Sequence, residues 1–300
     1  MLAHHRLTLG RFPHHHVHPR DTRGGTGEFA PPRHSRTVEL SADTSYSIEV
    51  VMRISPRRAA GAVAAAFACA LVPPTGAHAV VGGAPVGATD YPWLAAIGTP
   101  VYATRPGGQF CAGALIAPDR VLTAAHCGAL ARTLPGTTVT FGRTDVAGHG
   151  GVTIGIADVR IDPDFRVSLF GTDLSYHHNV AVLVLSAPVA LPTVAVAAPH
   201  GDTATVVGWG ATSEDDQSNS VLRAATVPLV PDAACAVAYA AEFDPAEAVC
   251  AGSTTADTAE FDSGGPLLVD GKVAGITSWG KGAAEPGFPG VYARVPALDF

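Results

Sequence analysis

From residue 80 onward, the chain contains short runs of apolar residues or of alternating apolar and polar residues. Of all the features of the sequence, this pattern limits the possible folds most strongly. Gly, Pro, Asp and Ser stand between one run and the next. The clearest runs cover residues 115–116, 121–125, 180–185, 204–207, 266–269 and 273–277. Strands that recur this closely, without amphipathic helical windows between them, predict an all-β sandwich or barrel. Residues 233–241 are the one segment with the pattern of a short helix.

The composition agrees with a chain that is rich in turns and poor in charge. Charged residues make up 15% of the 300, and there are 33 Gly and 24 Pro. Soluble domains average about 25% charged residues, about 7% Gly and about 5% Pro. From residue 80 onward, 10 Lys and Arg stand against 21 Asp and Glu, a net charge of −11. An acidic body without basic clusters argues against nucleic acid as a partner.

A leader segment precedes residue 80. Three arginines soon follow Met52, an apolar run covers residues 59–72, and Ala-His-Ala stands at 77–79. This order is typical of a secretory signal peptide, and the run is shorter than the roughly 20 residues that span a bilayer. We therefore expect residues 52–79 to be removed and the protein to be secreted and extracellular, without membrane attachment after cleavage.

Residues 1–51 stand upstream of this leader, although a signal peptide belongs at an N-terminus. They hold seven of the 13 histidines, including His14, His15 and His16. A metal-binding segment is one interpretation of these histidines. We favour the other, in which translation starts at Met52 and residues 1–51 are non-native or disordered.

Four cysteines follow the leader: Cys111, Cys127, Cys235 and Cys250. An even number in an oxidising compartment favours disulfides, for which three pairings are possible. The pairing of sequence neighbours, 111 with 127 and 235 with 250, is the simplest of the three. Metal binding is the alternative, but no Cys-x-x-Cys or His-x₃-His spacing supports it. We therefore expect no metal and no cofactor.

Three stretches carry residues suited to nucleophilic chemistry. Ser263 lies in Phe-Asp-Ser-Gly-Gly-Pro, where two glycines and a proline predict a sharp turn. Such a turn exposes a serine hydroxyl and lets nearby backbone N–H groups meet an oxyanion. His126 ends the stretch Leu-Thr-Ala-Ala-His-Cys, at the predicted end of an apolar strand, where a histidine alone is more often structural than catalytic. Val-Val-Gly-Gly, residues 80–83, becomes the new N-terminus after cleavage.

Taken together, these stretches resemble the chymotrypsin/trypsin family of serine proteases. The matching motifs stand in the family's order at residues 80–83, 111–127, 206–210, 262–266 and 278–295. The resemblance implies two packed antiparallel six-stranded β-barrels with the active site in the cleft between them. It also implies one peptidase domain over residues 80–300. Relatives continue there into a C-terminal helix, so we expect that helix to be truncated in this sequence or absent from this molecule.

The resemblance implies a role for each matching residue. Ser263 is the nucleophile and His126 the general base. The backbone N–H groups of Phe261 and Ser263 form the oxyanion hole. Asp262 forms an ion pair with the α-ammonium group of Val80. Because signal peptidase frees that ammonium group directly, we expect export in a ready-folded state.

Specificity follows from the same resemblance. Asp257, six residues before Ser263, matches the acid at the base of the primary pocket in trypsin-like members, which implies cleavage after Arg or Lys. A surface-loop acid is the alternative, because the segment around Asp257 is polar. The other residues that the resemblance assigns to substrate binding are Ser278, Trp279, Gly280 and Gly290.

Asn179 is the sharpest departure from the family, because it stands where members have the catalytic aspartate. Asparagine accepts a hydrogen bond from the imidazole but brings no negative charge, and this replacement lowers kcat by about 10⁴ in serine proteases. Asp173, six residues upstream, replaces the missing carboxylate only if a loop folds inward.

Two further differences concern the oxyanion hole and the pocket. Phe261 replaces a glycine, and a left-handed backbone costs a non-glycine residue about 1–2 kcal/mol. Ala259 and Ala283 replace the two cysteines of a disulfide that joins the pocket walls in many members, which predicts a looser pocket.

Two functions are compatible with these observations. The first is a monomeric, secreted serine endopeptidase that cleaves protein or peptide substrates after Arg or Lys, is weakened by Asn179, and is open to protein inhibitors. The second is an inactive homologue that binds protein through the retained cleft. Asn179 and Phe261 favour the second function, whereas His126, Ser263 and Asp257 favour the first. A structural or metal-binding protein is a third interpretation that rests only on the upstream histidines.

Overall fold

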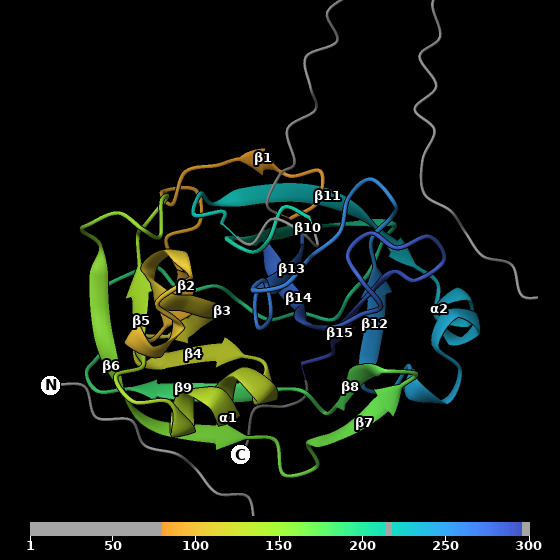
Figure 1. The fold of residues 1–300 in the computed structure, drawn as a ribbon, viewed down its shortest axis with the longest axis horizontal. Coiled ribbons are helices and arrows are strands. Elements are labelled where there is room, and N and C mark those ends of the chain that lie inside the picture. The colour runs from red at the N-terminus through yellow and green to blue at the C-terminus, as the bar shows by residue number, and fades with distance from the viewer. Residues whose placement is uncertain (1–79, 214–217, 296–300) are drawn as a thin grey trace, which may run out of the picture. The chain divides into compact units, whose positions relative to one another are not determined.

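The computed structural model describes residues 80–213 and 218–295 (Figure 1). The predicted signal peptide, residues 52–79, and the upstream segment 1–51 lie outside the described residues and stay predictions. Residues 296–300, at the chain end where the C-terminal helix is predicted to be truncated, also lie outside the described residues.

The first barrel is a closed antiparallel ring of six strands. In ring order they are β2 (Leu94–Gly98), β3 (Gln109–Ala117), β4 (Arg120–Thr123), β9 (Ala181–Leu185), β6 (Val152–Ile161) and β5 (Thr138–Phe141). Leu115, Leu122 and Leu183 are fully buried in the hydrophobic core. The apolar runs read from the sequence thus become strands because their side chains fill this core.

The second barrel is also closed by antiparallel pairing. Its ring is β11 (Arg223–Val230), β10 (Thr203–Gly208), β13 (Pro266–Val269), β14 (Lys272–Trp279), β15 (Gly290–Ala293) and β12 (Ala248–Ala251). Pairing of β12 with β11 completes the ring, and the short β1 (Ala84–Pro85) adds to β11. The predicted all-β fold of two antiparallel six-stranded barrels is confirmed.

A helix, α1 (Ala125–Thr133), follows β4 directly and was not predicted. The sequence pattern indicated a strand over residues 121–125, whereas β4 ends at Thr123. Ala124 is as fully buried as the strand before it, so apolar character does not separate the end of the strand from the start of the helix. His126 therefore lies in the first turn of a helix and not at the end of a strand.

The predicted helix at residues 233–241 is confirmed as α2 (Asp232–Tyr239). Two disulfides fix the helices to the barrels: Cys111–Cys127 joins β3 to α1, and Cys235–Cys250 joins α2 to β12. The simplest of the three predicted pairings is therefore the correct one. Three 3₁₀ helices complete the regular structure: η1 (Pro100–Tyr102), η2 (Pro106–Gly108) and η3 (Ala240–Glu242).

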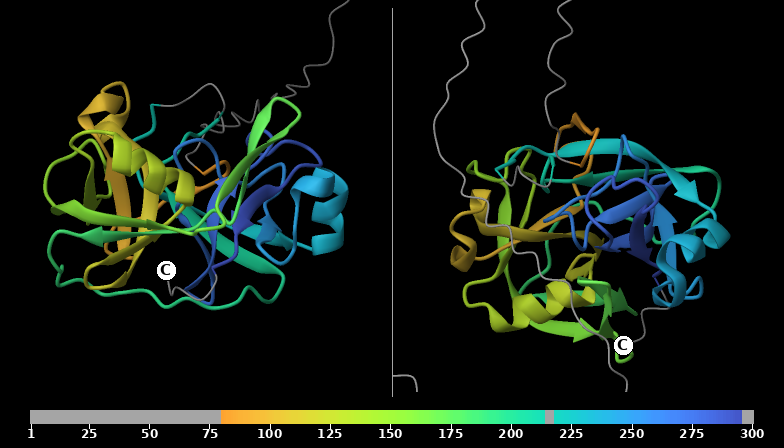
Figure 2. Two further views of the ribbon diagram at one scale, coloured as in Figure 1. Left: turned by 90° about the horizontal axis from the view of Figure 1, so that it is seen from below. Right: turned by 45° about the vertical axis from the view of Figure 1, so that its right-hand side comes forward.

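A two-stranded hairpin, β7 (Arg166–Phe170) and β8 (Asp173–His177), reaches from the first barrel to the second (Figure 2). It contacts η3, where Ser175 Oγ donates a hydrogen bond to Glu242 Oε2 at 2.6 Å. The strand β8 ends two residues before Asn179. The hairpin therefore connects the second barrel with the segment that carries Asn179.

Candidate active site

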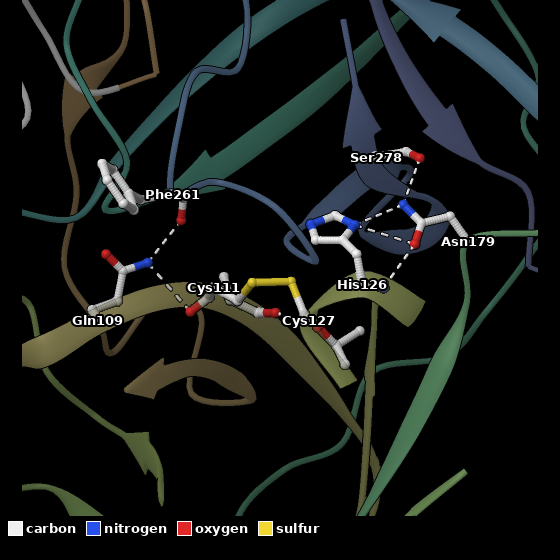
Figure 3. The surroundings of a disulfide bond; sticks show 9 residues. Gln109, Cys111, His126, Cys127, Asn179, Phe261 and Ser278 are labelled. Carbon is white, nitrogen blue, oxygen red and sulfur yellow. Dashed lines mark hydrogen bonds between the residues drawn. A yellow bond between two sulfur atoms is a disulfide. The ribbon is translucent and has the colours of Figure 1, made fainter. Parts of the chain in front are cut away.

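The side chains of His126 and Asn179 lie against each other, although they are 53 residues apart in the sequence (Figure 3). His126 lies in α1 beside the disulfide-bonded Cys127. Asn179 is fully buried between β8 and β9, directly after His178, whose φ of +48° turns the chain. The predicted site residues from the two segments are thus brought together.

Two neighbours fix the orientation of the Asn179 amide. Its Oδ1 accepts the backbone N–H of His126 at 3.0 Å, and its Nδ2 donates to Ser278 Oγ at 2.7 Å. A backbone N–H can only donate, so the amide oxygen must face it. The amide nitrogen is consequently the atom nearest to the imidazole: Nδ2 lies 3.0 Å from His126 Nδ1, and Oδ1 lies 3.2 Å from it.

This arrangement favours the imidazole tautomer that is least suited to a general base. When an amide N–H donates to Nδ1, the ring proton of a neutral histidine resides on Nε2. Burial lowers the pKa of His126 to about 4, and the hydrogen bond with Asn179 offsets part of this effect. Within the described part of the chain, no carboxylate forms a hydrogen bond with the His126 ring, and Asp173 lines the neighbouring cavity instead.

Ser263 lies in a tight turn that rests on the first barrel. Its carbonyl oxygen accepts the N–H of Ala112, in β3, at 2.8 Å. Gly264, with φ +78°, approaches β4 so closely that a Cβ would lie 2.2 Å from Thr123 Oγ1. Only glycine fits this approach, which explains the first of the two glycines after the serine. Ser263 itself is half-buried, and no hydrogen bond joins its hydroxyl to His126 among the described residues.

Two backbone donors in this turn have no acceptor. The N–H groups of Asp262, Gly264 and Gly265 all donate to carbonyl oxygens, whereas those of Phe261 and Ser263 donate to no described residue. These two are the donors predicted for the oxyanion hole. Phe261 has φ +70°, so it adopts the left-handed conformation that favours glycine.

Asp262 is buried directly behind the turn. Its carboxylate accepts the N–H of Gly210 at 2.8 Å and that of Ala259 at 3.1 Å. Burial raises the pKa of Asp262 to about 7, while these hydrogen bonds and the nearby charge of Arg105 lower it in part. A buried carboxylate of this kind lowers the stability of the folded protein when it is charged and no cation pairs with it.

Val80 lies in the same barrel as Asp262. Its side chain is fully buried among core residues of the second barrel. The next residue, Val81, forms a β-bridge with Asp257. No ion pair joins Val80 to Asp262 among the described residues, because Val80 is still bound to Ala79 through a peptide bond and has no ammonium group. The predicted ion pair therefore stays a prediction for the cleaved chain.

A cavity of about 540 Å³ opens beside Ser263. Its lining includes the predicted substrate-binding residues Ser278, Trp279, Gly280 and Gly290, together with both alanines that replace the missing disulfide, Ala259 and Ala283. Asp257 lies directly behind this lining, since a Cβ on Gly290 would be 2.6 Å from Asp257 Oδ1. Asp257 is 2% exposed, and burial raises its pKa to about 7 against the hydrogen bonds that it accepts from neighbouring backbone N–H groups.

Two clusters in the described chain have metal-ligating atoms close together. In the first, His126 stands with Cys111 and Cys127, whose sulfur atoms are already joined in a disulfide. In the second, Asp162, Asp164 and His178 have ligand atoms within 4.8 Å of one another. His178 Nε2 already lies 2.8 Å from Glu247 Oε2, and the acidic pair lies at a turn, so neither cluster favours a metal site.

Three residues around the site had no signal in the sequence. The Tyr176 ring stacks on His126, with centroids 4.6 Å apart. Gln109 Nε2 donates to the carbonyl oxygen of Phe261 at 2.7 Å, and the guanidinium carbon of Arg105 lies 4.0 Å from the centre of the Phe261 ring. These contacts join distant segments, so no local pattern could have revealed them.

Comparison with known proteins agrees with the fold. The family model described as "Trypsin" matches residues 80–300. A trypsin from Saccharopolyspora erythraea is 41% identical over 226 residues, which cover 73% of this chain and 94% of the relative.

Two more distant relatives cover nearly the same region. A trypsin-like protease from Streptomyces glaucescens is 34% identical over 79% of this chain and 87% of its own length. A vitellin-degrading protease from Bombyx mori is 33% identical over 75% of this chain and 84% of its own length. Among the described residues, we find no helix that is long and apolar enough to cross a membrane. Because the family model matches residues 80–300 and the relatives are this similar in sequence, the chain belongs to the trypsin family of serine proteases.

Proposed function

We propose that this protein is a secreted serine endopeptidase that cleaves protein or peptide substrates after Arg or Lys, at a rate reduced by Asn179. The observation that carries the proposal is the Ser263 turn. It presents a hydroxyl to a cavity beside two backbone N–H groups, of Phe261 and Ser263, that have no acceptor within residues 80–213 and 218–295. A turn that only shaped a core would have little reason to leave two such donors unpaired.

The chemistry follows from this geometry. Ser263 Oγ attacks the scissile carbonyl carbon while its proton passes to Nε2 of His126. As negative charge develops on the carbonyl oxygen, this oxygen accepts hydrogen bonds from the N–H groups of Phe261 and Ser263. The C–N bond then breaks as His126 returns the proton to the leaving amine. Water repeats the sequence on the acyl-enzyme and releases the acid product.

Asn179 slows the first step in two ways. It brings no charge to stabilise the imidazolium ion, and its Nδ2 favours the tautomer in which Nε2 already holds a proton. The barrier then rises by about 5–6 kcal/mol, which corresponds to a factor of about 10⁴ in rate.

Asp257 supports a preference for basic residues. Its carboxylate is buried directly behind Gly290 at the cavity wall, and burial holds its pKa at about 7 in the empty protein. An incoming guanidinium or ammonium group would compensate this buried charge. Gly280 and Gly290 leave the entrance open, and the segment Ser278–Gly280 offers backbone groups to the substrate chain.

Secretion and maturation form the last part of the proposal. The signal peptide at residues 52–79 supports export, and cleavage after Ala79 would create an ammonium group on Val80. Asp262 is buried and its pKa is raised to about 7, so such a cation would stabilise its charged form. The mature protein would act as a monomer without cofactor.

A second candidate function is protein binding by an inactive homologue. The specific observation in its favour is the contact of Asn179 Nδ2 with His126 Nδ1, since it disfavours proton transfer to His126. The cavity and Asp257 would then bind a basic side chain without cleaving the adjoining bond.

One experiment separates the two candidates. The chain from Val80 is assayed at high enzyme concentration on matched peptide amides that end in Arg, Lys or Phe, beside Ser263→Ala. The peptidase proposal expects slow hydrolysis of the Arg and Lys amides that Ser263→Ala abolishes. Binding of the peptides without any Ser263-dependent hydrolysis would support the inactive homologue, and preference for the Phe amide would contradict the role of Asp257.

A further inference from the structure

Phe261 is held at both its ring and its carbonyl group. The guanidinium carbon of Arg105 lies 4.0 Å from the centre of the ring, and Gln109 Nε2 donates to the carbonyl oxygen at 2.7 Å. The two holding side chains are joined, since Arg105 Nη2 donates to Gln109 Oε1 at 2.8 Å. A cationic plane, an amide and the aromatic residue thus form one connected unit.

The two polar members of the unit are buried. Arg105 is 5% exposed and Gln109 is fully buried, which is unusual for such polar side chains. Arg105 precedes η2 and also donates to the carbonyl oxygen of Trp209 at 3.2 Å, whereas Gln109 begins β3. Contacts with both barrels therefore fix the guanidinium plane on which the Phe261 ring lies.

Phe261 needs such support because of its backbone conformation. With φ +70° it stays in a region that costs a non-glycine residue about 1–2 kcal/mol, and strain of this kind persists only where the surroundings impose it. Rotation of the peptide between residues 260 and 261 would release the strain, but it would also break the 2.8 Å hydrogen bond that the Glu260 carbonyl oxygen accepts from the Ala211 N–H. The same rotation would turn the Phe261 N–H, one of the two unpaired donors, away from its present direction.

We propose that Arg105 and Gln109 are positioning residues that hold Phe261 in the left-handed conformation and keep its N–H available to the oxyanion. This inference rests on the proposed peptidase function. Arg105 acts by stacking on the ring. Gln109 holds the Phe261 carbonyl group, which belongs to the next peptide, and so limits rotation of the backbone on the other side of the Phe261 Cα. The two residues thereby stabilise at a phenylalanine the left-handed backbone conformation that a glycine adopts without support.

A double-mutant cycle tests the proposal through catalysis. Arg105→Ala, Phe261→Gly and the double variant are prepared in the Asn179→Asp chain from Val80, in which the rate is easier to measure. Loss of one oxyanion donor costs about 10²–10³ in kcat, so partial loss on Arg105→Ala should lower kcat about 10–100-fold with KM changed by less than about threefold. In the Phe261→Gly background, the same Arg105→Ala change should lower kcat by less than about threefold, because glycine does not need the support.

Two control variants separate support of the ring from other effects of a charge. Arg105→Lys keeps a positive charge near Asp262 but loses the planar group, so its kcat should fall as far as that of Arg105→Ala. Arg160→Ala, on the exposed side of β6, should leave kcat unchanged. Equal losses from Arg105→Ala in both backgrounds, or no loss in either, would overturn the proposal.

The same double-mutant cycle can be measured by thermal unfolding, which does not depend on activity. Removal of the contact between Arg105 and the ring should lower Tm by about 2–4 °C more when residue 261 is Phe than when it is Gly. If the chain hydrolyses nothing and this coupling is present, the proposed function fails and the contact is upheld. If the coupling is absent, the positioning role is wrong whatever the activity.

Discussion

The Ser263 turn and the His126–Asn179 pair are the two halves of the proposed active site, and each differs at one residue from the pattern that the family resemblance predicts. At the turn, Phe261 stands in place of a glycine, yet its N–H remains unpaired. At the pair, Asn179 stands where the sequence pattern predicts an aspartate and contacts His126, but its side chain has no charge. A role performed by a backbone group survives a change of side chain at a cost in strain. A role performed by side-chain charge disappears with the side chain.

The largest expected effect comes from restoring that charge. Asn179→Asp should raise kcat on an Arg amide by about 10³–10⁴, because a carboxylate orients the imidazole through its Nδ1–H and stabilises the imidazolium ion. Steady-state kinetics of the variant and the wild-type chain from Val80 measure the change. Ser263→Ala added to Asn179→Asp must remove the gain, which shows that the same site is responsible.

The pH dependence of that variant sharpens the comparison. Burial lowers the pKa of His126 to about 4 in the wild type, so its acid limb of kcat/KM should lie near that pH. A carboxylate at residue 179 favours the charged ring, so the acid limb of Asn179→Asp should move to higher pH. An unchanged limb together with an unchanged rate would show that residue 179 does not govern His126.

A smaller effect is expected from the charge that remains at the site. Asp257→Asn should lower kcat/KM for an Arg amide by about 10²–10³, since one partner of a desolvated charge pair is worth about 2–5 kcal/mol. The Phe amide serves as the matched control and should change by less than about threefold. Similar losses on both amides would mean that Asp257 shapes the cavity and does not select its occupant.

The dependence of the Ser263 turn on its backbone conformation can be tested at two glycines that have similar φ angles. Gly264 has φ +78° and would place a Cβ 2.2 Å from Thr123 Oγ1, whereas Gly271 has φ +71° and open space around it. Gly271→Ala should cost about 1–2 kcal/mol of unfolding free energy for the conformation alone. Gly264→Ala should cost about 1–3 kcal/mol more, because the chain must also shift. Urea unfolding compares the two, and equal losses would show that the turn can adapt to a side chain.

The contrast also explains which parts of the molecule the sequence could predict. The barrels were predictable because buried strands need apolar runs and turns need Gly or Pro, and both are visible locally. The predicted positions of Asn179 and Asp257 relied on motifs whose spacing carries over from relatives. The first turn of α1 was not predictable, since Ala124 and Ala125 satisfy a buried strand and a buried helix equally well.

The two residues that support Phe261 could not be predicted from apolar runs, turn residues or motif spacing. Arg105 and Gln109 are separated from it by about 150 residues and are joined to it by ring stacking and a hydrogen bond. Neither residue belongs to a motif that the sequence displays. Compensation for an unusual residue can come from any segment that folds beside it, so its source becomes visible only in three dimensions.

The smallest expected effect concerns the stability cost of keeping a charge at Asp257. Burial raises its pKa to about 7, above its value in an unfolded chain, so the folded protein binds more protons than the unfolded one between about pH 4 and pH 7. The unfolding free energy should therefore fall as the pH rises from about 4 to about 7 and level off above that. Between pH 5 and pH 8, the wild type should lose about 1–3 kcal/mol more than Asp257→Asn, whose side chain stays neutral. Urea unfolding of both proteins at the two pH values measures this difference, and a loss of equal size would show that the carboxylate is solvated in the empty pocket.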